Sequence, residues 1–286
     1  MSQIVRIGVL KAGCLGSLPL IEFLIDERAD RSDVDVLVAG SGAKLGPQQC
    51  ETTSKWLISQ RPDFIVLIGP AQQTPGPARA RKMLTEAGIP AIVISDGPTR
   101  AIIKELESLG FGYIIVDADA MIGARREFLD PVEMALYNSD MIKILAITGV
   151  LQVVVNRLDD LIQSVKKGEK LSLPRLVVDK DMAVESSGLT NPYSKVKAMA
   201  AYEIARCAAG VDSEACFRIK EWERYVRLVA CGHDLVRTAA KLVDDAREID
   251  KAGDSVVRRP HYADGSLGVK KRLVEKPQRV EKGESE

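Results

Sequence analysis

Histidine, net charge and catalytic signatures are scarce in this chain of 286 residues. The only two histidines, His233 and His261, do not form an H-x-x-x-H or mixed histidine and cysteine cluster, which argues against a catalytic zinc site. The G-x-S-x-G motif is also absent, so a serine nucleophile has no support. Lys+Arg 40 balance Asp+Glu 40, so neither nucleic acid nor an anionic membrane is an expected partner.

Paired cysteines and long apolar runs are lacking too. The chain has five cysteines, an odd number, and no two have C-x-x-C spacing, so we expect free thiols in a reducing cytosol. No signal sequence is recognisable, and charged or turn residues interrupt every apolar stretch before about 18 residues. A cytoplasmic protein is therefore expected. Its 46% hydrophobic content is enough for a substantial core, and the absence of net charge favours a small-molecule ligand.

The first part of the chain alternates short β-branched runs with helix-length segments. Uninterrupted valine, isoleucine and leucine runs are typical of strands buried on both faces of a parallel sheet. The predicted fold class is α/β, an open doubly wound parallel sheet, in a ligand-binding domain at 1–128 that also takes in a strand at 175–179. The other predicted strands are 4–10, 34–39, 64–68, 91–95 and 113–116, and the helices are 18–28, 47–60, 76–87 and 101–109.

Helices dominate the second part, a predicted helical bundle region at 129–254. Asp130, Pro131 and Glu133 form a strong helix start, and this helix is expected to run to about 167, with Gly149 able to bend it. Further helices are predicted at 191–209 and from Trp222 to Gly253. The remainder, 255–286, is predicted to form a small antiparallel hairpin that turns at 261–265, followed by a basic tail that is solvated or contacts another subunit.

Glycine and proline follow the predicted strands at one edge of the sheet. Ligands of open parallel sheets bind beyond the carboxyl ends of the strands, where unpaired amides face the ligand. The first loop has G-x-x-G spacing, which is not the full dinucleotide fingerprint, and a plain tight turn explains any single loop about equally well. The candidate cofactor-binding residues in these loops are Lys11, Gly13, Cys14, Leu15, Gly16, Ser41, Gly69, Pro70, Asp96, Gly97 and Pro98.

The loop after the fifth strand carries two adjacent arginines, whose guanidinium groups suit phosphate or carboxylate. The alternative is that they pair with nearby acidic residues or with a neighbouring subunit. His233 is more often a packed bundle residue than a base, although the adjacent Gly232 permits a close backbone approach. The candidate substrate-binding residues are Asp119, Met121, Ile122, Gly123, Arg125, Arg126 and His233.

Longer motifs resemble those of a known family. The chain resembles the coenzyme F(420)-dependent methylenetetrahydromethanopterin dehydrogenases over almost its whole length. The segments that carry the resemblance are LIDERADR at 24–31, PGP at 75–77, AMIGARREFLDPVEMA at 120–135, NPY at 191–193 with VKAMAA at 196–201, and ERYV at 223–226.

The resemblance implies reversible hydride transfer between 5,10-methylene- and 5,10-methenyltetrahydromethanopterin, with coenzyme F(420), an 8-hydroxy-5-deazaflavin, as dissociable cosubstrate. It also implies a homohexamer built as a trimer of dimers. Such a reaction needs orientation and exclusion of water, so no metal and no catalytic side chain are expected. Two alternatives stay open: a nicotinamide-dependent pterin dehydrogenase and a ligand-binding subunit without catalytic activity.

Overall fold

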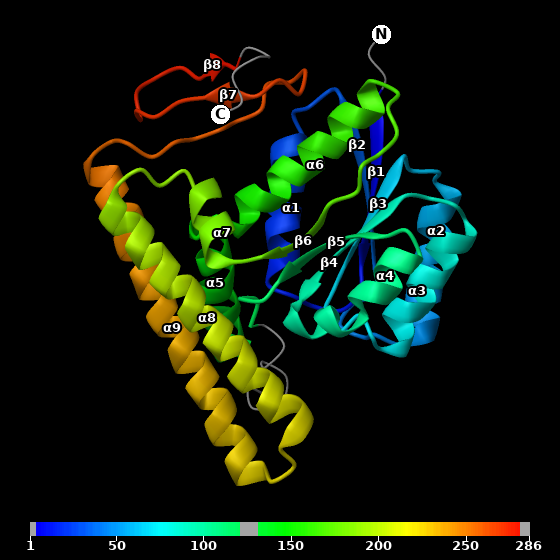
Figure 1. Ribbon diagram of the computed structural model, residues 1–286, viewed down its shortest axis with the longest axis horizontal. Coiled ribbons are helices and arrows are strands. Elements are labelled where there is room, and N and C mark those ends of the chain that lie inside the picture. Colours follow the sequence, from blue (N-terminus) through cyan, green and yellow to red (C-terminus); the bar gives the residue numbers. More distant parts are fainter. Residues whose placement is uncertain (1–3, 121–130, 281–286) are drawn as a thin grey trace.

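The computed structural model describes residues 4–120 and 131–280, and its centre is one parallel sheet (Figure 1). The six strands follow the order β2-β1-β3-β4-β5-β6, and every neighbouring pair is parallel. The prediction of an open, doubly wound sheet is confirmed. The strands are β1 (Val5–Lys11), β2 (Val34–Gly40), β3 (Phe64–Ile68), β4 (Ala91–Asp96), β5 (Gly112–Val116) and β6 (Arg175–Val178).

Helices cover both faces of this sheet, which is why its central strands read as unbroken apolar runs. Val66 and Ile68 of β3 pack into one core, and Ile65 and Leu67 of the same strand pack into the other, as the two-residue period of a strand requires. The first core includes α1 (Ser17–Arg28), α5 (Pro131–Ile147) and α6 (Val150–Lys166). The second includes α2 (Pro47–Ser59), α3 (Pro75–Glu86) and α4 (Ile103–Ser108), the last preceded by the 3-10 helix η1 (Gly97–Ile102).

The single helix expected from 131 to about 167 is in fact two helices. Gly149 has a φ of +100°, a left-handed conformation that ends α5, and α6 leaves it at an angle of 61°. A Cβ on Gly149 would lie 2.0 Å from the carbonyl oxygen of Ala183 in α7 (Lys180–Ser186). Close contact with α7, a helix that the sequence pattern did not predict, therefore accompanies the break.

Two long helices, α8 (Pro192–Arg218) and α9 (Trp222–Ala252), form an antiparallel pair that extends beyond the sheet (Figure 1). The side chain of Asn191 accepts a hydrogen bond from Tyr193 N at 2.8 Å, so the predicted cap is present. The predicted end of α8 at 209 is wrong, because the helix continues against α9 through Gly210 to Arg218. Within residues 4–120 and 131–280, no one helix is long and apolar enough to span a membrane; α5 and α6 reach that length and composition only when taken together across their bend.

The C-terminal segment turns back as predicted and forms a small antiparallel sheet. The turn is closed by a hydrogen bond from Tyr262 N to Ser266 O at 2.9 Å and by a bridge between His261 and Leu267. Arg279 of the basic tail pairs with Asp264 and lies over the Tyr262 ring. The two strands of this sheet are β7 (Gly268–Val269) and β8 (Gln278–Arg279).

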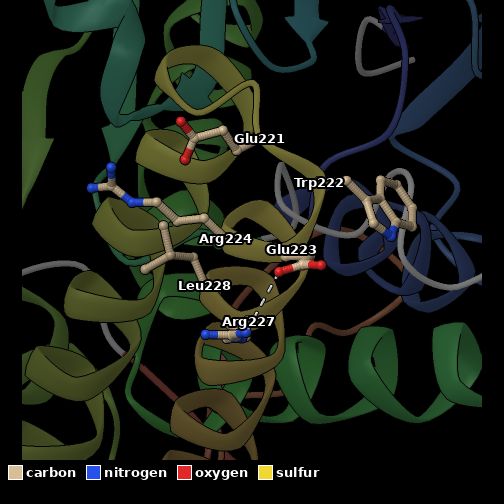
Figure 2. A pocket seen from close by; sticks show the side chains of 6 residues that line it. All are labelled: Glu221, Trp222, Glu223, Arg224, Arg227 and Leu228. Carbon is tan, nitrogen blue, oxygen red and sulfur yellow. Dashed lines mark ion pairs between the residues drawn. The ribbon is translucent and has the colours of Figure 1, made fainter.

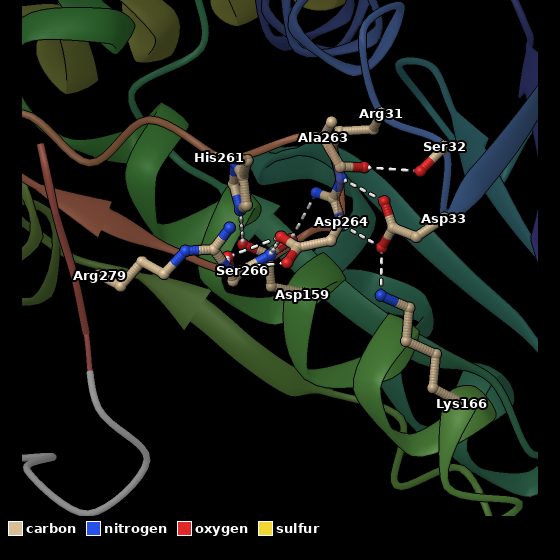
Figure 3. A network of polar contacts seen from close by, with 10 residues as sticks. All are labelled: Arg31, Ser32, Asp33, Asp159, Lys166, His261, Ala263, Asp264, Ser266 and Arg279. Carbon is tan, nitrogen blue, oxygen red and sulfur yellow. Dashed lines mark hydrogen bonds and ion pairs between the residues drawn. The ribbon is translucent and has the colours of Figure 1, made fainter. Parts of the chain in front are cut away.

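A buried polar network fastens this segment to the α/β part (Figure 3). Two nitrogens of Arg31 donate to the two carboxylate oxygens of Asp33, each at 2.8 Å, and Lys166 donates to the same carboxylate. Asp159 forms an ion pair with Arg31 at 3.5 Å and lies 2.7 Å from Nε2 of His261. Burial alone would raise the pKa of Asp33, but the hydrogen bonds and charges of Arg31 and Lys166 lower it to about 2.

We expect Asp33→Asn to lower the free energy of unfolding by about 3–5 kcal/mol, because two cations would lose their buried partner. The matched control is Asp35→Asn, two residues further along the chain, whose exposed 3.4 Å ion pair with Arg6 contributes about 0–1 kcal/mol. The folded-state pKa of Asp33 is depressed below its usual 3.8. Its contribution is therefore present above that value and is lost as the pH falls towards 2. Urea unfolding between pH 7 and pH 2 measures both effects; equal losses in the two variants would contradict them.

Candidate functional site

The strand order reverses between β1 and β3, and the loops that follow these two strands touch each other. In such sheets the ligand crevice lies at this reversal, beyond the carboxyl ends of the strands. Ala12 N donates to Ile68 O at 2.8 Å, and a Cβ on Gly69 would lie 1.9 Å from Ala12 O. A Cβ on Gly13 would lie 3.5 Å from Pro70 Cδ. Three predicted residues, Gly13, Gly69 and Pro70, are thus brought together, and Gly69 is required for the contact.

The loop after β2 joins the same group. Ser41 Oγ accepts a hydrogen bond from Gly13 N at 3.2 Å, and Ser41 N donates to Lys11 O at 2.9 Å. The Lys11 ammonium group, half-buried, is paired with Glu22 of α1. Leu15 is fully buried in the core, so only its backbone can face a ligand.

The amides at the start of α1 are satisfied by Asp119, which follows β5. Gly16 N donates to Asp119 Oδ1 at 3.0 Å, and both the amide (2.6 Å) and the hydroxyl (2.7 Å) of Ser17 donate to Oδ2. Asp119 is 1% exposed. A carboxylate at a helix N-terminus is stabilised by the amides and by the helix dipole. This helix terminus therefore already holds an anion, supplied by the chain itself.

Asp96 ends β4 beside the loop after β3. Its Oδ1 accepts from Ala71 N at 3.1 Å, whereas its buried Oδ2 has no hydrogen-bond partner within residues 4–120 and 131–280. Burial raises the pKa of Asp96 to about 6, and the neighbouring charge of Asp119 acts in the same direction. The next two predicted residues, Gly97 and Pro98, are partly exposed.

A second polar group links Asp119 to the long helices. Tyr137 of α5 donates to the carbonyl oxygen of Ala120 and lies 2.9 Å from Asp212 Oδ2 in α8. The His233 ring of α9 stacks on the Tyr137 ring at 3.8 Å between centroids. Burial lowers the pKa of His233 to about 4, so its imidazole is neutral near pH 7. His233 is in this way joined to the strand-end loops through one tyrosine.

Sequence reasoning missed Tyr137 and Asp212. Neither belongs to a local motif, because their contacts join three separate helices and the residue after Asp119. One signal was present: a Cβ on Gly232 would lie 2.0 Å from Asp212 Oδ1, so the glycine next to His233 marks a close approach, but to a carboxylate of α8.

The remaining predicted residues are less constrained by the structure. Cys14 is exposed on the first loop, and partial burial and the nearby Asp119 charge raise the pKa of its thiol. No three histidine, cysteine or acidic side chains gather as metal ligands in the part of the chain that the structure describes. The predicted residues Met121, Ile122, Gly123, Arg125 and Arg126 lie outside the described residues.

Comparison with known proteins gives one consistent match. Residues 5–278 match the family model described as methylene-5,6,7,8-tetrahydromethanopterin dehydrogenase. The chain is 49% identical over 277 residues to the F(420)-dependent methylenetetrahydromethanopterin dehydrogenase of Methanocaldococcus jannaschii, covering 96% of this chain and 100% of that protein. The Methanothermobacter marburgensis enzyme of the same name is 48% identical over 276 residues, with the same coverage.

A solved structure is similar along the same length. It is an F(420)-dependent methylenetetrahydromethanopterin dehydrogenase in complex with methylenetetrahydromethanopterin and coenzyme F(420). The TM-score is 0.91 at 44% sequence identity, and the match covers 96% of this chain and 100% of that one.

The contact between Gly16 and Asp119 predicts the effect of one substitution. In Gly16→Ala the new Cβ would lie 2.7 Å from Asp119 Oδ1 and 3.0 Å from Met141 Cγ, so the carboxylate has to move from the start of α1. We expect a loss of about 1–3 kcal/mol in the free energy of unfolding. The control is Gly210→Ala inside α8, where the added Cβ meets nothing within 4 Å and should stabilise the helix by up to about 1 kcal/mol. Urea unfolding compares them, and a Gly16→Ala protein as stable as the wild type would refute the role given to this glycine.

Proposed function

The chain belongs to the methylene-5,6,7,8-tetrahydromethanopterin dehydrogenase family, and on that premise we propose how it works as an oxidoreductase. It transfers a hydride reversibly between 5,10-methylenetetrahydromethanopterin and coenzyme F(420), giving 5,10-methenyltetrahydromethanopterin and the reduced coenzyme. The observation that carries this conclusion is the whole-length match, at a TM-score of 0.91, to an enzyme that holds both compounds. The resemblance inferred from the sequence motifs is confirmed.

We propose that the strand-end loops bind the coenzyme. When bound, the deazaflavin supplies the hydride-accepting ring. Gly13 and Gly69 let the loops after β1 and β3 approach closely, which a larger side chain at Gly69 would prevent. Asp96, at the end of β4, accepts a hydrogen bond from Ala71 N and so supports the loop after β3. The proposed coenzyme residues are therefore those predicted: Lys11, Gly13, Cys14, Leu15, Gly16, Ser41, Gly69, Pro70, Asp96, Gly97 and Pro98.

Asp119 restricts where the negative groups of the ligands bind. Because its carboxylate takes the amides of Gly16 and Ser17, a phosphodiester has to use other donors, such as Lys11 or the exposed loop after Ser41. The pterin would lie on the side of the long helices. Its proposed residues are Asp119, Met121, Ile122, Gly123, Arg125, Arg126 and His233.

The described residues of this site favour orientation over proton transfer. Burial lowers the pKa of His233 to about 4 and its ring stacks on Tyr137, so at neutral pH it is an uncharged flat ring rather than an imidazolium acid. Hydride transfer gains most from holding two rings in contact and excluding water. We propose that the chain has three parts. An α/β domain at 1–128, with the strand 175–179, binds the coenzyme; a helical region at 129–254 and a C-terminal segment at 255–286 follow it.

We also propose a cytoplasmic homo-oligomer, a hexamer built as a trimer of dimers. Large apolar side chains are exposed on the helices, including Tyr193 (77%), Phe217 (62%) and Trp222 (62%). Around the start of α9, Trp222 lies beside a pocket whose other lining residues are mostly charged (Figure 2). Exposed aromatic residues with a polar surround are typical of subunit interfaces.

The assay that tests the function mixes purified protein, methylenetetrahydromethanopterin and oxidised coenzyme F(420), and follows the visible absorbance of the deazaflavin. We expect that absorbance to fall with turnover, and no turnover with NAD or NADP, because the first loop lacks the dinucleotide fingerprint. Comparable rates with NADP would favour a nicotinamide-dependent enzyme. Ligand binding without turnover would favour a subunit that has no catalytic activity.

The oligomer proposal predicts that the active species is larger than one chain of 31.2 kDa. Sedimentation at the assay concentration should give the mass of six chains. A Trp222→Glu variant should shift it towards smaller species, because a charge would replace exposed apolar surface at the proposed interface. The control is Leu273→Glu in the C-terminal segment, where the side chain is similarly exposed (66%). A fully active wild-type monomer would rule the proposal out.

A further inference from the structure

The loop after β3 contains a strained residue at the point where the strand order reverses. Ala71 has a φ of +49°, a left-handed conformation that is unfavourable for a residue with a Cβ. Its side chain is 5% exposed. Backbone strain of this kind persists only where surrounding contacts impose it, and it is concentrated at functional sites. The contacts around Ala71 therefore show which groups impose the strained conformation.

Asp96 and its neighbours hold this loop at both ends. Asp96 Oδ1 accepts the hydrogen bond from Ala71 N at 3.1 Å. Ser95 Oγ donates to Gly69 O at 2.7 Å and lies 2.7 Å from Thr99 Oγ1. Gln72 Nε2 donates to the same Gly69 oxygen at 3.0 Å. Ser95, Asp96, Thr99 and Gln72 are all 1% exposed or less, so the loop rests on a buried polar cluster at the end of β4.

The loop that is held in this way forms part of the contact between the two strand ends. Gly69 lies against the backbone of Ala12, and Pro70 lies beside Gly13. If the left-handed turn at Ala71 relaxed, Gly69 and Pro70 would move relative to the loop after β1. A change at Asp96 would then reach the crevice through the backbone, without any contact between Asp96 and a ligand.

We propose that Asp96 is a positioning residue for coenzyme binding: it holds Ala71 in its left-handed conformation and so fixes Gly69 and Pro70 against the loop after β1. The inference rests on the proposed function, because it takes the crevice to be the coenzyme site. A glycine at position 71 would adopt the same conformation without strain, so the need for Asp96 should decrease when Ala71 is replaced by glycine.

The test is the Kd of coenzyme F(420), measured by titration of its fluorescence, together with kcat and KM. Asp96→Ala should raise the Kd and the KM for the coenzyme about tenfold, equivalent to about 1.4 kcal/mol, with kcat changed by less than about threefold. Asp96→Asn keeps an acceptor for Ala71 N and should therefore bind the coenzyme almost as tightly as the wild type. The double variant that combines Asp96→Ala with Ala71→Gly should likewise recover most of the affinity. The matched control is Asp63→Ala, at the opposite edge of the sheet. This variant also removes a carboxylate that accepts a hydrogen bond from a backbone amide, here Arg6 N at 2.7 Å. Its Kd should equal that of the wild type.

Three results would overturn the proposal. An unchanged Kd in Asp96→Ala would show that the loop does not need the carboxylate. Equal losses in Asp96→Asn and Asp96→Ala would indicate direct contact through the charge. Failure of the glycine to restore affinity would indicate a general loss of stability.

If Asp96→Ala melts before it can be titrated, Ala71→Val provides the same test with Asp96 intact. A β-branched residue resists the left-handed conformation and should raise the Kd about as much; an unchanged Kd there would be equally decisive against the proposal. A wild-type protein that binds no coenzyme would instead disprove the proposed function itself, and this inference with it.

Discussion

The hydrogen bonds between Asp119 and the first amides of α1 are the interaction on which the site depends. They join the end of β5 to the loop after β1, across most of the width of the sheet, and they neutralise the positive end of α1. Through Ala120 and Tyr137, the same segment reaches Asp212 in α8 and His233 in α9. One buried carboxylate thus links the loop after β1 to the long helices.

A site built in this way suits a reaction in which two bound rings exchange a hydride. The described polar groups are mostly satisfied by one another: Asp119 by α1, Lys11 by Glu22, and Tyr137 by Ala120 and Asp212. Groups that are already hydrogen-bonded do not have to reorganise when ligands bind, which is the condition for holding reactants in a fixed geometry. At the opposite edge of the sheet, Arg31, Asp33 and Lys166 form a buried charge cluster, and Asp159 connects Arg31 to His261 of the C-terminal segment.

The sheet could be predicted from the sequence because its strands are unbroken apolar runs, such as Phe64–Ile68, and the strand-end loops could be located for the same reason. The division into two helices at Gly149 could not be predicted. In the sequence, a glycine that bends a helix cannot be distinguished from a left-handed glycine that ends one, and the contact with Ala183 is a tertiary contact. The partners of Asp119 and Tyr137 could not be predicted from the sequence either. They lie 102 and 75 residues away along the chain, and no local periodicity encodes such pairs. Asp96 was selected from its position, but its link to a strained Ala71 depends on a backbone angle.

We propose that hydride passes directly between the two rings in one ternary complex. The most direct test of this transfer uses methylenetetrahydromethanopterin deuterated at the transferred position, in ordinary water, with analysis of the reduced coenzyme by mass spectrometry or NMR. We expect each reduced deazaflavin to carry one deuterium, at the same face of the ring in every molecule. Deuterium released to the solvent, or reduced coenzyme that carries only protium, would contradict direct transfer and require a protein group in the path.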